Sequence, residues 1–266
     1  MTVVPGAPVW MVGCGTMGGA MLRRWIAAGL PADRFTVITR GGASLPSGVR
    51  HLHALPPGEA PGSVVLAVKP QQLDAIVPLM RGSAPPLLLS ILAGVEEAAL
   101  AARFAADAIV RAMPNLPVAI GRGVVALHWS GSDPDVRGTA EALMAPLGHV
   151  EWIDEERLFD AVTALAGCGP AFVFRFADAL AEAGAALGLP PGQAMRLALA
   201  TLDGAAAMAH AADAPPAALA DRVASPGGST REGLNVLDRG DALAELMRET
   251  LAASARRNAE MAAAAR

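Results

Sequence analysis

The sequence contains little charge, few aromatic side chains, no tyrosine and only two cysteines in 266 residues. Charged residues make up 17% and the formal net charge is −4, so no basic excess is present to neutralise phosphates. This balance argues against a nucleic-acid partner. Cys14 and Cys168 lie far apart and outside any metal-ligand spacing, which fits a reducing compartment and predicts no metal site.

Long hydrophobic runs are missing as well. The charge-free apolar stretch 161–174 covers only about 14 residues before Arg175, fewer than the roughly 20 that a membrane helix needs. Residues 1–10 have no basic start followed by a long apolar run, so they do not indicate a signal peptide. We therefore expect a cytoplasmic protein without a membrane partner.

The composition that is present is that of a globular protein, with 53% hydrophobic residues. In the first half of the chain, short β-prone runs alternate with segments of helical spacing. Such alternation predicts an α/β domain with a parallel sheet and right-handed crossovers, as in Rossmann-type folds. The expected strands are Val9–Val12, Phe35–Thr39, Val64–Val68, Leu87–Ile91, Ala108–Arg111, Val124–Trp129 and His149–Ile153. The expected helices are Met17–Ala28, Gln71–Arg81, Val95–Phe104 and Pro134–Met144.

After about Asp154 the pattern changes to long Ala- and Leu-rich segments with almost no β-branched runs. These features predict an all-helical second domain. We place the Rossmann-type domain at 1–154 and the helical domain at 155–266. The segments break where Pro or Gly residues gather, at 188–191, 215–216 and 225–228.

The helical domain also predicts self-association. Its segments carry Ala, Leu and Met on more than one face, too apolar for lone surface helices, so we expect an obligate homodimer. A larger assembly of such dimers stays open. The Ala-rich tail 252–266 fits either the end of a long helix or a frayed segment, and the sequence does not decide between them.

A glycine-rich turn follows the first expected strand and opens the first expected helix. Gly13 and Gly15, with Gly18, form the G-x-G-x-x-G pattern in the context in which it indicates dinucleotide binding. Gly13 permits a tight turn, Gly15 lets the backbone approach a pyrophosphate, and Thr16 and Met17 begin a helix whose N–H groups face the phosphates. The alternative is a simple turn.

Three further positions extend this expected cofactor site. The second strand ends at Arg40 with no acidic residue for several positions, which favours a 2′-phosphate and hence NADPH over NADH, although an ordinary exposed loop arginine is the alternative. The third strand ends in Val68, Lys69 and Pro70 at the ligand-binding edge of the sheet, and Lys69 is the only lysine in the chain. A solvated lysine is the alternative there. Ala93 follows the fourth strand and leaves room for a ribose or a nicotinamide.

Several motifs occur in order along the chain: the Gly13-x-Gly15-x-Met17 turn, VLAVKP at 65–70, RAMPNLP at 111–117, GRG at 121–123 and SPGGST at 225–230. With these motifs the chain resembles the pyrroline-5-carboxylate reductase family, from about residue 9 to residue 260. The resemblance implies a Rossmann domain followed by a dimerising helical domain. It implies reduction of 1-pyrroline-5-carboxylate, a small cyclic imine, to L-proline with NADPH or NADH, the final step of proline biosynthesis.

The resemblance also implies roles for individual residues. Asn115 is assigned to the cofactor site. The loop residues Ser225, Gly227, Gly228 and Ser229 are expected to hold the substrate carboxylate. Thr230 is expected to reach the ring nitrogen and to act in catalysis. Independently of the resemblance, 225–228 cannot be helical, and Ser229 or Thr230 is a good N-cap for a helix beginning at Arg231, although a plain interhelical turn is the alternative.

The chain departs from the family where Ala166, Cys168 and Phe172 replace two serines and a tyrosine. Each lost hydroxyl removes a hydrogen bond of roughly 0.5–1.5 kcal/mol if it touches the substrate, so a related cyclic imine remains an alternative. A β-hydroxyacid-type dehydrogenase is less favoured, because such enzymes often use a lysine in the second domain and Lys69 lies in the first. A non-catalytic NADP-binding regulator is the least favoured. The five histidines are scattered, and we interpret them as structural or solvated.

Overall fold

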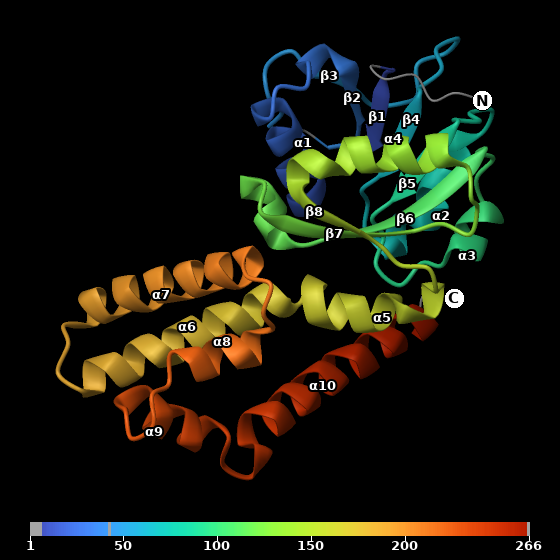
Figure 1. The fold of residues 1–266 in the computed structure, drawn as a ribbon. Coiled ribbons are helices and arrows are strands. Elements are labelled where there is room, and N and C mark those ends of the chain that lie inside the picture. The colour runs from blue at the N-terminus through green and yellow to red at the C-terminus, as the bar shows by residue number, and fades with distance from the viewer. Residues whose placement is uncertain (1–6, 42–43, 265–266) are drawn as a thin grey trace. The chain divides into compact units, whose positions relative to one another are not determined.

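The structure is a computed structural model that describes residues 7–41 and 44–264 (Figure 1). The chain forms two compact units, which we describe one at a time. The first contains the residues up to Cys168 together with those from Ser254 onward, and the second is Gly169–Ala253. This division falls later than the change of sequence pattern at Asp154, because the first helical turns after Asp154 pack with the sheet.

An eight-stranded sheet forms the centre of the first unit, in the order β3-β2-β1-β4-β5-β6-β7-β8. The expected α/β architecture of the first part of the chain and the all-helical second part are therefore confirmed. The strands are β1 (Val9–Val12), β2 (Phe35–Ile38), β3 (Arg50–Leu52), β4 (Ser63–Leu66), β5 (Leu87–Ser90), β6 (Ala108–Pro114), β7 (Gly123–His128) and β8 (Gly148–Trp152).

Two features of the sheet differ from the expectation. Strand β7 pairs antiparallel with β6, with Arg111 opposite His128, whereas the other pairs are parallel. Only the short turn η4 (Leu116–Ile120) connects them, and a connection of that length cannot make a parallel crossover. Strand β3 was not expected, because its three residues lie at the sheet edge without an apolar pattern.

Helices cover both faces of the sheet. On one face, α1 (Thr16–Ala27) and α4 (Pro134–Met144) pack on the strands and share a core with them. Trp25 joins the two helices, since its indole N–H donates to the Leu143 carbonyl at 2.6 Å. On the other face lie α2 (Leu73–Ile76) and α3 (Glu97–Ala101). The expected helix 71–81 is divided into η2 (Pro70–Gln72), α2 and η3 (Val77–Met80), and Pro78 lacks the N–H that a continuous helix would need.

From Glu156 to Ala264 the chain is helical, with breaks at the three expected places and a further kink at Gly240. After η5 (Ala145–Leu147), β8 and η6 (Glu156–Leu158), the helix α5 (Phe159–Val162) passes into the π-helical turn η7 (Thr163–Gly167). The second unit then contains α6 (Gly169–Ala186), α7 (Pro191–Ala211), α8 (Pro216–Arg222) and α9 (Ser229–Leu237). After η8 (Arg239–Asp241), α10 (Ala242–Ala264) begins in the second unit and ends in the first, so most of the Ala-rich tail is helix.

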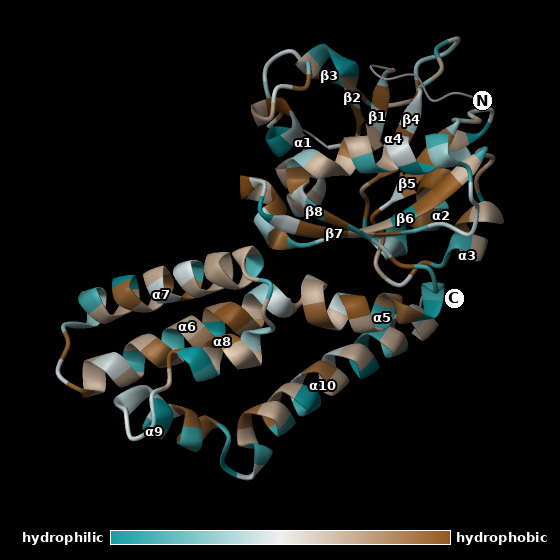
Figure 2. Cartoon of the chain, viewed as in Figure 1, coloured by the Kyte–Doolittle hydropathy of each residue, from teal (hydrophilic) through white to brown (hydrophobic). Residues whose placement is uncertain are grey.

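The second unit buries very little apart from alanine. Helices α6 and α7 pack through Ala181, Ala194 and Ala198. Larger apolar side chains lie exposed, and Figure 2 shows brown, hydrophobic residues along α6 and α10. They are Val173, Phe174, Phe176, Leu180, Leu187, Leu189, Leu197, Leu199, Met208, Val223, Val236, Leu237, Leu243, Leu246 and Met247. Within the described residues, the helical run Glu156–Ala186 has the length and composition of a membrane span, with a mean hydropathy of 1.3 and 17% of that window buried.

Candidate active site

The glycine turn after β1 lies where the strand order reverses, with β2 on one side of β1 and β4 on the other. Ligands of open α/β sheets bind at this point. Gly13 has φ +86°, and a Cβ there would lie 2.6 Å from Val68 Cγ1 and 2.7 Å from the Ala67 carbonyl oxygen. Gly15 is the N-cap of α1 and has open space where its Cβ would be. The backbone of Gly15 is therefore free for close approach by a ligand, while Gly13 is fixed by the adjoining strand.

A cavity of about 870 Å³ opens in front of this turn. Three cations line it, Arg23, Arg40 and Lys69, and its described lining contains no carboxylate. A lining of this kind, next to the free N–H groups of a helix N-terminus, suits a polyanionic ligand such as a dinucleotide. The structure brings together here the expected cofactor residues Gly13, Gly15, Thr16, Met17, Arg40, Val68 and Lys69.

Two residues beside Arg40 were not anticipated from the sequence. Ser44 and His53 line the same end of the cavity. His53 Nδ1 lies 3.0 Å from the Thr39 carbonyl oxygen, and an Nδ1–H that donates to this oxygen leaves Nε2 as the other ring nitrogen for a ligand. His53 comes just after the edge strand β3, which has no apolar pattern, so the sequence alone gives no sign that this residue reaches the cavity.

A second cavity of about 760 Å³ adjoins the first, since Met17 and Ile91 line both. The expected cofactor residues Pro70 and Ala93 belong to this second lining. Residues from β6, from the turns around Phe159 and from α10 complete the lining. Most residues of the whole lining are apolar. Its polar members are Gln71, Asp74, Arg111, Asp160, Thr163, Cys168 and Asn258. Such a mostly apolar cavity beside a glycine-rich turn at a helix N-terminus suits a nicotinamide ring and a small uncharged or zwitterionic ring.

Asn115 is not part of either cavity lining. It is buried, its Nδ2 donates to the Ala166 carbonyl at 2.9 Å, and its Oδ1 accepts from the Val124 N–H at 2.8 Å. Both ends of the amide are thus used within the protein. These contacts support the position of the π-helical turn that contains Ala166, and they give no support to the assignment of Asn115 as a cofactor ligand.

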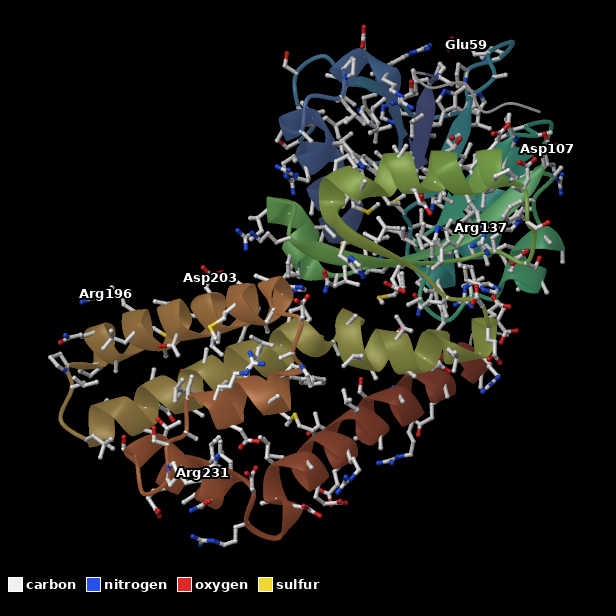
Figure 3. All side chains as sticks on the ribbon, in the orientation of Figure 1. Glu59, Asp107, Arg137, Arg196, Asp203 and Arg231 are labelled. Carbon is white, nitrogen blue, oxygen red and sulfur yellow. The ribbon has the colours of Figure 1, made fainter. Side chains whose placement is uncertain are left out.

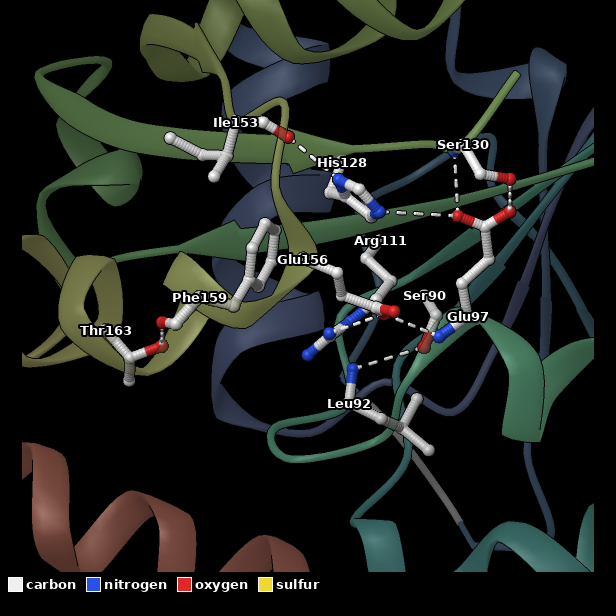
Figure 4. Close-up of polar contacts among 10 residues, drawn as sticks. All are labelled: Ser90, Leu92, Glu97, Arg111, His128, Ser130, Ile153, Glu156, Phe159 and Thr163. Carbon is white, nitrogen blue, oxygen red and sulfur yellow. Dashed lines mark hydrogen bonds and ion pairs between the residues drawn. The ribbon is translucent and has the colours of Figure 1, made fainter.

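Arg111 forms one wall of the second cavity and is held there by Glu156 and Phe159 (Figure 4). Its Nη1 donates to Oε1 of Glu156 at 2.7 Å, and its guanidinium lies 4.4 Å over the ring of Phe159. Glu156 Oε1 also accepts from the backbone N–H of Glu97 at 2.7 Å. Burial raises the pKa of Glu156, but the hydrogen bonds from Glu97 and Arg111 outweigh it, so the pKa lies below its ordinary value.

Two of the chain's departures from the family pattern lie at the π-helical turn η7, since Ala166 is in the turn and Cys168 follows it directly. The Cys168 N–H donates to the Thr163 carbonyl at 2.8 Å, closing a π turn, and such turns are frequent at functional sites. Cys168 and Gly167 line the second cavity. The Cys168 sulfur accepts from the Ser254 hydroxyl at 3.3 Å, whereas Ala166 presents only its carbonyl to Asn115. The thiol in place of the usual serine is therefore a wall of the cavity.

The loop Ser225–Thr230 lies in the second unit and has the local geometry of an anion site. Gly227 has φ +71°, and the Gly228 N–H donates to the Ser225 carbonyl at 2.9 Å. One detail of the expectation is wrong. Helix α9 begins at Ser229 with Gly228 as its N-cap and no side-chain cap, so neither Ser229 nor Thr230 caps the helix. Within the described residues, both hydroxyls are exposed and without a hydrogen bond.

An ion pair closes this loop. The guanidinium of Arg231, labelled in Figure 3, donates to Asp221 Oδ1 at 2.7 Å. Asp221 is thus held by a structural partner, which fixes the two ends of the loop. The N–H groups of residues 229–231 are in the first turn of α9 and have no partner within the helix.

Comparison with known proteins gives the family. Residues 156–261 match the model of the pyrroline-5-carboxylate reductase dimerisation family. A pyrroline-5-carboxylate reductase of Synechocystis sp. is 36% identical over 243 residues, which cover 86% of this chain and 89% of that protein. The solved structure of a pyrroline-5-carboxylate reductase from Coxiella burnetii has a TM-score of 0.87 and 30% identity, covering 96% of this chain and 98% of that one.

A second solved structure shares the fold. It is the Plasmodium falciparum pyrroline carboxylate reductase with NADP bound, which is 23% identical with a TM-score of 0.81 and covers 96% of this chain and 98% of that one. The similarity to these relatives extends over most of the chain that forms the glycine turn, the two cavities and the helical half. This chain belongs to the pyrroline-5-carboxylate reductase family.

Proposed function

We propose that this protein reduces 1-pyrroline-5-carboxylate to L-proline with NADPH. The observation that carries the proposal is the phosphate-binding turn at Gly13–Gly18, which opens into two adjoining cavities, one cationic and one mostly apolar. When bound, the dinucleotide supplies the hydride that adds to the C=N carbon. The protein then has to orient the imine and keep its nitrogen protonated, which is mainly catalysis by proximity.

The preference for NADPH over NADH rests on the adenosine end of the first cavity. Arg40, Ser44 and His53 line it, and none of the described lining residues offers a carboxylate to bind a ribose 2′-hydroxyl. A 2′-phosphate would receive charge-assisted hydrogen bonds from the Arg40 guanidinium. Lys69 and the N-terminus of α1 would hold the pyrophosphate.

The substrate carboxylate would be held by the loop Ser225–Thr230. The partner-free N–H groups at the start of α9 and the Ser225 hydroxyl suit a carboxylate, with Gly227 and Gly228 leaving room for it. The Thr230 hydroxyl would then donate to or relay a proton at the ring nitrogen. A related cyclic imine is a second candidate substrate, because Ala166, Cys168 and Phe172 replace hydroxyl residues of the family.

We also propose that two chains form a homodimer through residues 155–266, the proposed second domain. In 169–253 the buried hydrophobic residues are all alanine, and the large hydrophobic ones are half-buried or exposed. Burying one such side chain contributes about 1.5–3 kcal/mol, so covering this surface is strongly favourable. The apolar run Glu156–Ala186 falls in the segment that matches the dimerisation family, which favours a partner chain over a membrane as its cover. We keep the cytoplasm as the proposed location.

Consumption of NADPH by the purified protein tests the activity. We expect absorbance at 340 nm to fall when 1-pyrroline-5-carboxylate is added, and proline to appear in equal amount. No reaction with this imine, but turnover of a homologue with a larger ring, would replace the first candidate substrate by the second. Absence of turnover with either imine, while NADPH still binds, would overturn the proposed activity.

A further inference from the structure

The amide nitrogen of Asn258 is a buried polar atom without a hydrogen-bond partner at the edge of the site. Three buried side-chain polar atoms in the described chain have no hydrogen-bond partner, and Asn258 Nδ2 is one of them. Of these three residues, only Asn258 lines either cavity of the site. A buried N–H without an acceptor is costly, which makes it a candidate for pairing with something that the free protein does not contain.

The position of Asn258 is set by neighbours in the same unit. It lies four residues after Ser254 on α10, so both residues face the same way. The Ser254 hydroxyl is 3.3 Å from the Cys168 sulfur, which places this face of α10 against the π-helical turn. Asn258 therefore lies beside Gly167 and Cys168 at the wall of the second cavity.

Three of the other polar side chains of that wall are already engaged. Arg111 donates to Glu156, Asp74 accepts from Arg103, and the Thr163 hydroxyl donates to the Phe159 carbonyl. The Asn258 amide differs from them because its N–H groups have no acceptor. The terminal torsion of asparagine is broad, so a small rotation would turn the amide toward the cavity that the residue lines.

We propose that Asn258 is a ligand-binding residue of the reductase site, whose amide donates a hydrogen bond to an oxygen acceptor of the bound molecules. The acceptor is a carbonyl or carboxylate oxygen, from either the carboxamide of the nicotinamide or the carboxylate of the imine. The inference rests on the proposed reductase function for the identity of those molecules. It gives the C-terminal part of α10 a role in binding that the glycine turn and the loop Ser225–Thr230 do not supply.

The test compares Asn258→Ala and Asn258→Asp with the wild-type protein, with Arg256→Ala as a control on an exposed position of the same helix. The dissociation constant of NADPH is measured by fluorescence without imine, and the Michaelis constant for the imine is measured at saturating NADPH. We expect both Asn258 variants to raise one of these constants by about 3- to 10-fold, the loss of one hydrogen bond. A rise in the NADPH constant identifies the nicotinamide as the acceptor.

A rise in the Michaelis constant for the imine instead identifies the substrate carboxylate as the acceptor. This rise should be larger for Asn258→Asp, because the two carboxylates would then repel each other. Both constants within twofold of wild type in both variants would overturn the proposal.

The thermal unfolding of the free protein separates binding from folding. An unpaired amide stabilises nothing, so free Asn258→Ala should unfold at the wild-type temperature or above. Its rise in unfolding temperature on adding the ligand that Asn258 contacts should be smaller than that of the wild-type protein. A lower unfolding temperature of free Asn258→Ala would show that the amide is paired without ligand, and would also overturn the proposal.

The design keeps this inference separate from the proposed activity. Failure of the wild-type protein to reduce 1-pyrroline-5-carboxylate would remove the proposed substrate only. The NADPH-binding comparison between wild type and the Asn258 variants would still decide whether the amide contacts the cofactor.

Discussion

Nη1 of Arg111 lies 2.7 Å from Oε1 of Glu156, and this pair joins the sheet to the first residue of the segment that matches the dimerisation family. Arg111 is on β6 and its side chain is 8% exposed, whereas Glu156 begins η6 and its side chain is 28% exposed. Because Arg111 also lines the second cavity, the pair connects the wall of the site to the start of the helical half of the chain.

We expect Glu156→Gln to lower the free energy of unfolding at pH 7 by about 1–3 kcal/mol, because the buried Arg111 would lose its charged partner. The pKa of Glu156 is below its ordinary value of 4.5, so the stabilisation is complete above pH 4.5 and is lost as the pH falls through the lowered pKa. Urea unfolding at pH 7 and at about pH 3 should therefore show a difference between the two proteins that shrinks in acid.

The matched control is Glu155→Gln. Glu155 pairs with Arg157 on the surface, where their side chains are 55% and 73% exposed, and such pairs contribute little. Equal losses of stability in the two variants would contradict the importance of the buried pair.

Replacement of Arg40 by alanine should change the choice of cofactor. We expect kcat/KM with NADPH to fall by about 10-fold or more, since a charge-assisted hydrogen bond to the 2′-phosphate is lost, and kcat/KM with NADH to stay within about twofold. The ratio of the two values is the measurement. Arg81→Ala, an exposed arginine outside both cavity linings, is the control. An unchanged ratio in Arg40→Ala would remove Arg40 from the site.

Cys14 should react slowly with alkylating agents. Burial raises the pKa of its thiol, and Arg23 only partly offsets this, so little thiolate is present at neutral pH. We expect alkylation in a Cys168→Ser background to be slower than for a free thiol at pH 7, to accelerate as the pH rises toward 9, and to slow again when NADPH is added. The protection follows from the position of Cys14 in the lining of the first cavity. Equal rates with and without NADPH would place the cofactor elsewhere.

Light scattering should find a dimer at micromolar concentration. Phe174 and Phe176 on α6 have exposed fractions of 57% and 47%, so the double variant Phe174→Glu, Phe176→Glu should weaken self-association if these residues lie between two chains. Arg196→Ala on α7 removes no apolar surface and serves as the control. A wild-type protein that stays monomeric would contradict the proposed dimer.

Replacement of Thr230 should separate catalysis from folding. The hydroxyl of Thr230 is exposed and does not cap α9, so Thr230→Ala should leave the unfolding temperature nearly unchanged. If the hydroxyl acts at the imine nitrogen, kcat should fall much more than stability does, and Thr230→Ser should keep most of the activity. Wild-type turnover by Thr230→Ala would show that the nitrogen is handled by another group.

Local sequence alone determined much of the first unit. Seven of the strands and the glycine turn after Val12 could be located from short apolar runs and from the position of Gly13 and Gly15. The reason is that a buried parallel strand needs a continuous apolar run, and a turn with positive φ between strand and helix needs glycine. The motifs at 111–117 and 225–230 likewise indicated the family, because each is a short contiguous stretch that can be recognised without its neighbours in space.

Tertiary structure decided what depends on residues distant in the chain. The amide of Asn115 is engaged by Ala166 and Val124, and no local pattern could show this. His53 enters the first cavity because the edge strand β3 places it beside Thr39. Asn258 lines the second cavity although it is far in sequence from most of the other lining residues. Backbone propensities act over a few residues, whereas burial and the pairing of polar groups are settled only when separate segments pack together.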